Sequence, residues 1–181
     1  LPPPFWDRAF RSTGPLWPLF VLLVRCWAFG TEQKSKSSRL PPYIQKLWLA
    51  TLLVWIVMGI FRIGFYLLVR DYNVFFSDHI FLTVSMLAMV TMELLLAWET
   101  REHIASWWMP TAAGWLLVYV LNREAFITAK YYHTCQAVWA AFLVGTLIFG
   151  TVVAWWQRVL SDGVDNCSGP AKEGLEEPLK P

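Results

Sequence analysis

The sequence predicts an all-α integral membrane protein, a bundle of four to five transmembrane helices. Of the 181 residues, 56% are hydrophobic and only 15% are charged, whereas about a quarter of an average soluble domain is charged. The apolar residues also gather into runs of roughly 20, the length at which a helix crosses the hydrocarbon core of a bilayer. A single domain is expected, and the net charge of +2 gives no indication of a nucleic-acid partner.

The chain divides into a proline-rich, aromatic arm (residues 1–14), a transmembrane helical domain (15–160) and a hydrophilic tail (161–181). Consecutive prolines in the arm remove backbone donors, and the tail is too polar to bury a core. The arm therefore suits a membrane surface or a partner groove better than a helix, and both ends are expected to contact other membrane-protein subunits. Within the domain the apolar segments are 15–29, 47–69, 80–98, 104–121 and 137–156.

The first segment, residues 15–29, is shorter than the roughly 20 residues that span a bilayer. It is expected either to span or to lie at the interface, with Arg25 snorkelling towards water. The following loop, residues 30–43, is the most basic of the loops. The positive-inside rule places this loop in the cytoplasm, or in the matrix or stroma of an organelle.

The remaining segments carry features that predict how they pack. Pro110 and Gly114 are expected to kink or loosen segment 104–121, and residues 122–132 are expected to connect it to the last helix. Pairs of glycines would allow close helix packing; they are Gly59 with Gly64 and Gly145 with Gly150. Tryptophans near segment ends predict an interfacial girdle, formed by Trp48, Trp98, Trp107, Trp108, Trp155 and Trp156.

A polar triplet, Ser77-Asp78-His79, opens the apolar segment 80–98 and marks the main candidate site, because ionisable groups at membrane depth are functional candidates. From His79 one helical stripe continues through Thr83, Met86, Val90 and Glu93. Glu93 is an intramembrane acid, more easily explained as a satisfied or protonated packing residue than as a proton relay.

A second histidine, His133, precedes the last helix, and the alternation of the spans places it at the membrane level of His79. Arg62, Arg70, Arg123 and Lys130 are expected nearby. Of these, Arg62, Arg70 and Lys130 are the candidate ligands of a phosphate or lipid headgroup. Two histidines among cations suit phosphoryl chemistry, in which one attacks or activates water and the other protonates the leaving oxygen. The alternative is that both histidines are interfacial residues satisfied by water or backbone carbonyls.

No cofactor and no metal site are predicted. Cys26, Cys135 and Cys167 are too few and too dispersed for a zinc site or a disulfide framework. No haem-binding histidine spacing and no nucleotide-binding loop occurs in the sequence.

The segment Ser77-Asp78-His79-Ile80-Phe81-Leu82 resembles the Ser-Gly-His-x-Phe-Leu motif of the fat storage-inducing transmembrane (FIT) family, which is related to the lipid phosphate phosphatases. Tyr131-Tyr132-His133-Thr134 is similar to the second motif of that family, and Glu93 falls where the family carries an acid. The resemblance covers roughly residues 50–156. It implies a catalytic pair, His79 and His133, in an endoplasmic-reticulum protein that cleaves the diphosphate of fatty acyl-CoA and supports lipid-droplet formation.

Two departures from the family pattern bear on that activity. Asp78 replaces the glycine before the first histidine, so it disrupts the motif by placing a negative charge where a phosphate should approach. The residues after the second histidine, Gln136-Ala137-Val138, are mostly apolar where the family is polar.

Two hypotheses follow, and an unrelated helical bundle is the remaining alternative. In the first, the chain is a FIT-like protein without catalysis, an accessory subunit of a respiratory or photosynthetic complex, placed in the mitochondrial inner membrane or another organelle membrane. Its partners would be membrane lipids and other membrane-protein subunits. In the second, it is an active lipid diphosphatase of the endoplasmic reticulum.

Overall fold

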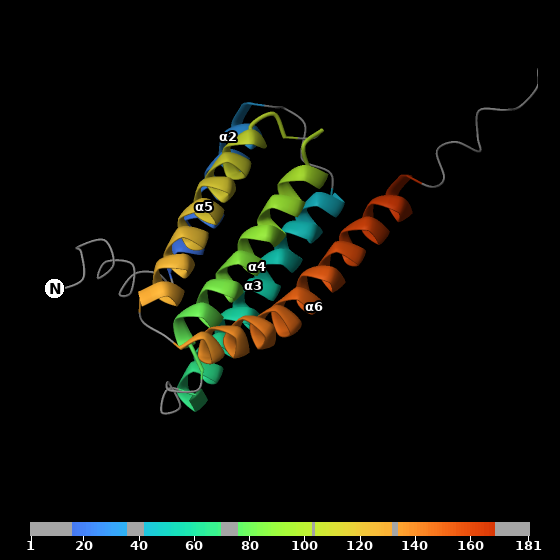
Figure 1. The fold of residues 1–181 in the computed structure, drawn as a ribbon. Coiled ribbons are helices and arrows are strands. Elements are labelled where there is room, and N and C mark those ends of the chain that lie inside the picture. The colour runs from blue at the N-terminus through green and yellow to red at the C-terminus, as the bar shows by residue number, and fades with distance from the viewer. Residues whose placement is uncertain (1–15, 36–41, 70–75, 103, 132–133, 169–181) are drawn as a thin grey trace, which may run out of the picture.

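The computed structural model describes residues 16–35, 42–69, 76–102, 104–131 and 134–168. In this part of the chain the regular structure is entirely helical, as the sequence predicts, and the helices lie together as a bundle (Figure 1). They are α2 (Trp17–Ser35), α3 (Pro42–Val69), α4 (Asp78–Glu99), α5 (Trp108–Tyr131) and α6 (Cys135–Ser168).

Helix α4 is the centre of the bundle and contacts all four of the other described helices. Apolar residues on several of its faces allow it to join two hydrophobic cores. One core combines α4 with α3 and α6, and includes Trp55, Phe81, Met92, Phe149 and Trp156. The other combines α4 with α2 and α5, and consists of Val21, Met86, Val90, Leu117 and Leu121.

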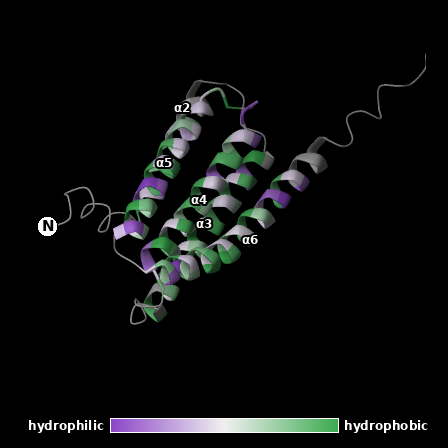
Figure 2. Ribbon diagram, viewed as in Figure 1, coloured by the Kyte–Doolittle hydropathy of each residue, from purple (hydrophilic) through white to green (hydrophobic). Residues whose placement is uncertain are grey.

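Three helices in the described part of the chain are long and apolar enough to cross a membrane. They lie at Ile44–Phe65, Asp78–Glu99 and Cys135–Asp162, and the apolar part of α2, Trp17–Thr31, is shorter. Helix α5 is not among them, although segment 104–121 was expected to span. Figure 2 shows the reason, because hydrophilic residues interrupt the second half of α5.

Two helices continue beyond their expected ends. Residues 122–131, expected as part of a connecting loop, are the last turns of α5. Helix α6 extends to Ser168 into the region expected as a polar tail. Pro110 does not interrupt α5, because it stands in the first turn, where its missing N–H has no partner within the helix. Residues 1–15 and 169–181 lie outside the described residues.

Two of the described glycines lie at close contacts between helices: Gly145, which was expected there, and Gly114, which was not. A Cβ added at Gly145 on α6 would meet Val84 of α4 at 3.1 Å, and one added at Gly114 on α5 would meet Leu94 at 2.7 Å. No atom lies within 4 Å of the corresponding positions at Gly59 and Gly64. Gly114 is therefore a packing residue, whereas the Gly59–Gly64 pair does not mediate packing within the described chain.

The tryptophan girdle is only partly as expected. Trp98, Trp108 and Trp155 are exposed, but Trp156 is fully buried in the core between α4 and α6. Neighbouring tryptophans on a helix point about 100° apart, so an apolar pair at a helix end does not place both rings in the interface.

Candidate functional site

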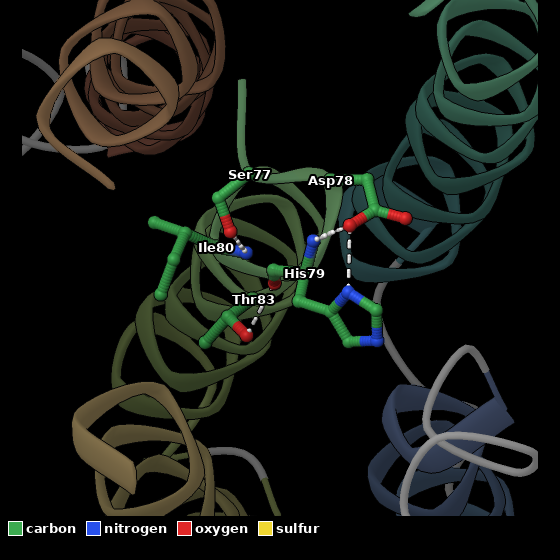
Figure 3. A network of polar contacts seen from close by, with 5 residues as sticks. All are labelled: Ser77, Asp78, His79, Ile80 and Thr83. Atoms are coloured by element: carbon green, nitrogen blue, oxygen red, sulfur yellow. Dashed lines mark hydrogen bonds and ion pairs between the residues drawn. The ribbon is translucent and has the colours of Figure 1, made fainter. Parts of the chain in front are cut away.

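The polar triplet forms the N-terminus of α4. Ser77 is the N-cap residue, with extended backbone, and its Oγ accepts a hydrogen bond from the N–H of Ile80 at 3.3 Å (Figure 3). Asp78 follows in the first turn, where its negative charge is favoured by the helix dipole. Capping and stabilisation of the helix N-terminus are therefore sufficient to explain Ser77 and Asp78.

Asp78 also holds His79. Its Oδ1 accepts a hydrogen bond from the backbone N–H of His79 at 2.8 Å and lies 2.6 Å from Nδ1 of the same residue's ring. The Asp78 side chain is 15% exposed and the His79 side chain 37%. A carboxylate this close fixes the orientation of the ring through Nδ1, and it repels a second anion that approaches the same ring.

The start of α6 lies against the start of α4, because the N–H of Ser77 donates to the carbonyl of Ala137 at 3.2 Å. The His79 ring, however, does not point that way. In Figure 3, Asp78 and His79 lie on the side of α4 facing α3 and α2, whereas α5 and α6 lie on the other side. The face of α4 that meets α6 carries Phe81 and Val84. His133 lies outside the described residues.

The expected phosphate ligands are spread over separate helices. Arg62 is half-buried on α3. Lys130 is exposed at the end of α5, with its Nζ 5.1 Å from the centre of the Tyr131 ring and 6.0 Å from that of Phe126. Arg70 lies outside the described residues. The two described cations thus belong to different helices, and Lys130 contacts aromatic rings of its own helix.

A different charged pair occupies the interior. Nε of Arg25 on α2 lies 3.0 Å from Oε2 of Glu93 on α4, and both side chains are only 1% exposed. Arg25 does not snorkel, contrary to the sequence-based expectation, because a buried acid on the neighbouring helix provides its partner. Glu93 is the buried end of the stripe on α4, in which Thr83, Met86 and Val90 are also buried.

Aromatic rings of α3 surround this pair. The guanidinium of Arg25 lies 5.2 Å from the centre of the Trp48 ring, a cation–π contact. Trp55 lies within reach of the Glu93 carboxylate as a donor, without ideal hydrogen-bond geometry. The pair therefore joins α2, α3 and α4. A sequence signal for it existed, because Arg25 and Glu93 both lie near the C-terminal ends of segments 15–29 and 80–98, which run in the same direction (Figure 1).

Among the described residues, no three His, Cys, Asp or Glu side chains gather as a group that could hold a metal ion. Comparison with protein-family models, with curated proteins and with solved structures gives no match. The resemblance to the FIT family therefore rests on the two short motifs.

Proposed function

We propose that this chain is an integral membrane protein that acts, without catalysis, as an accessory subunit of a larger membrane assembly of respiratory or photosynthetic type. The three helices that are long and apolar enough to span support the membrane location. Helices α2 and α5 would complete a bundle of four to five spans, since they pack beside α4 and against each other. The polar arm and tail would contact neighbouring subunits.

One observation carries the non-catalytic part of the proposal: the His79 ring lies beside Asp78 on the side of α4 away from α6. A two-histidine mechanism needs both rings on one substrate. His133 lies outside the described residues, so this point concerns His79 alone. A carboxylate 2.6 Å from the ring further opposes an anionic substrate.

Native-size analysis tests the subunit role. After extraction in mild detergent, the chain is expected to migrate with a large complex on a native gel and in size-exclusion chromatography. The association should resist added salt, because subunits of stable assemblies are held mainly by buried apolar contacts. Migration of the chain as a free particle of its own size would contradict the proposal.

The same Asp78–His79 contact favours a second candidate, an active lipid diphosphatase. In hydrolases a carboxylate that holds Nδ1 orients the imidazole and leaves Nε2 to transfer the proton. Hydrolysis of a fatty acyl-CoA by the purified chain would then fall by roughly 10²–10⁴-fold in His79→Ala. Hydrolysis at a rate that His79→Ala does not change would exclude this candidate.

A further inference from the structure

The outward face of α5 differs from the outward face of the apolar part of α3. Large side chains there carry polar atoms: Trp115 is 62% exposed, Tyr119 68%, and the Arg123 side chain 59%. Asn122 is also exposed. Between Leu49 and Leu68 of α3, by contrast, the exposed large side chains are aliphatic or phenyl groups, among them Leu53, Ile60 and Leu67. Only the second kind of surface suits lipid chains throughout its length.

The packing of α5 on α4 gives the depth of these residues. Gly114 lies against Leu94, and the two helices are antiparallel neighbours. Counting along both helices places Tyr119 level with Met89, near the middle of α4. Arg123 is then level with Ser85, about 10 Å from the N-terminus of α4 at 1.5 Å per residue. If α4 spans the membrane, this polar face runs from the bilayer centre towards one interface.

Polar groups at that depth need partners, because hydrocarbon offers none and each unsatisfied group is expensive. The structure supplies only some of them. The Nδ2 of Asn122 donates to the carbonyl of Val118 at 2.8 Å, and Nη1 of Arg123 donates to Oε1 of Glu124 at 3.1 Å. Since a guanidinium has five donors, the exposed Arg123 retains donors that face outward.

On this basis we infer that the α5 face binds a transmembrane helix of another protein, one that presents a carboxylate opposite Arg123 and hydrogen-bond acceptors opposite Tyr119 and Asn122. The inference rests on the proposed membrane location and deepens the subunit role. Exposed Trp, Tyr and Arg are the residue types that dominate binding energy at protein interfaces. A second copy does not fit, since a two-fold contact through this face would bring Arg123 against its own copy.

The test uses the full chain in phosphatidylcholine vesicles with two labelled transmembrane peptides. One is an oligoleucine helix with a single Glu at the depth of Arg123, and the other is the same helix with Leu there. Energy transfer is expected to show roughly tenfold tighter association of the Glu peptide, the range of interhelical polar contacts. Arg123→Leu should remove this difference, whereas Arg123→Lys should retain it.

Two further variants serve as a control for the loss of an arginine and as a test that does not depend on the folding of Arg123→Leu. Arg158→Leu removes an exposed arginine from the end of α6 and should leave the preference unchanged. Tyr119→Phe does not touch the Arg123–Glu124 contact. Against a Glu peptide that also carries Ser at the depth of Tyr119, it should weaken association by about twofold, even if Arg123→Leu fails to fold. Equal binding of both peptides to the folded wild-type chain would overturn the inference.

A lipid headgroup is the competing occupant. If both peptides bind equally, and Arg123→Leu instead lowers the binding of added phosphatidylglycerol, the arginine reaches the interface and the inference is overturned. This outcome leaves the subunit proposal standing, because that proposal depends on native size. Conversely, a chain that migrates alone but prefers the Glu peptide would sink the subunit proposal and keep the α5 face as a binding surface.

Discussion

Arg25 and Arg123 both stand within helices of the bundle, but the structure treats them in opposite ways. The Arg25 side chain is 1% exposed and pairs with Glu93 of another helix. The Arg123 side chain is 59% exposed and pairs with the adjacent residue, Glu124. The first arginine is used to join helices of this chain, and the second leaves most of its surface outside it.

The difference in burial between Arg25 and Arg123 indicates the structural role of each arginine. A buried ion pair is rarely more stabilising than apolar residues of the same volume, but it specifies which helices meet. Arg25 and Glu93 therefore fix the position of α2 on α4, which apolar side chains alone would leave less defined. Arg123 specifies nothing within the described chain beyond its own turn, which is the reason for assigning it to an external partner.

The largest expected effect comes from breaking the inner pair. Arg25→Leu or Glu93→Leu alone should lower the free energy of unfolding by about 3–5 kcal/mol, because each leaves an uncompensated buried charge. The double variant should recover most of this loss. Denaturation in mixed detergent micelles, followed by circular dichroism, measures all three.

The two single variants and the double variant form a double-mutant cycle, which shows whether Glu93 is ionised in the folded chain. Strong coupling between the two substitutions is expected if the carboxylate is ionised and paired with Arg25. If Glu93 were instead a protonated packing residue, Glu93→Gln would be almost neutral and the two single losses would simply add. That result would contradict the claim that Arg25 forms an ion pair inside the bundle whereas Arg123 lies on its surface.

A smaller effect is expected at the helix contacts that hold α4 in place. Gly145→Ala should destabilise the chain by about 1–3 kcal/mol, because the new methyl group meets the stiff side chain of Val84 at 3.1 Å. Gly59→Ala is the matched control on the outward side of α3, where no atom lies within 4 Å. It should leave stability unchanged or raise it by up to about 1 kcal/mol. Equal losses in both variants would show that α3 is also packed.

The sequence was sufficient to predict what depends on local pattern. The polar triplet and the apolar run after it predicted that a helix begins near Ile80, and the helical spacing predicted the stripe from His79 to Glu93. Pairing between helices was not predictable in this way. Periodicity shows that Arg25 and Glu93 each lie on a helix, but it does not say which helices are neighbours.

The second half of α5 was misjudged for a related reason. Asn122, Arg123 and Glu124 interrupt the hydropathy and suggest a loop. In the structure the helix continues, because Ala125 and Ala129 pack against the first core, and Glu124 turns inward while Arg123 turns outward. Tertiary packing supports the helix where composition does not. Of the candidate interface, Asn122 and Arg123 lie in the supposed loop.

The smallest expected effect concerns the outer arginine in the isolated chain. Arg123→Leu should change the free energy of unfolding in detergent by less than about 1 kcal/mol, since the contact with Glu124 is largely exposed and contacts of this kind contribute little. The same denaturation measurement applies, with Arg25→Leu as the internal reference. A loss as large as that of Arg25→Leu would mean that Arg123 holds the fold together. Its exposure could then no longer be attributed to a missing partner helix, and the contrast between the two arginines would disappear.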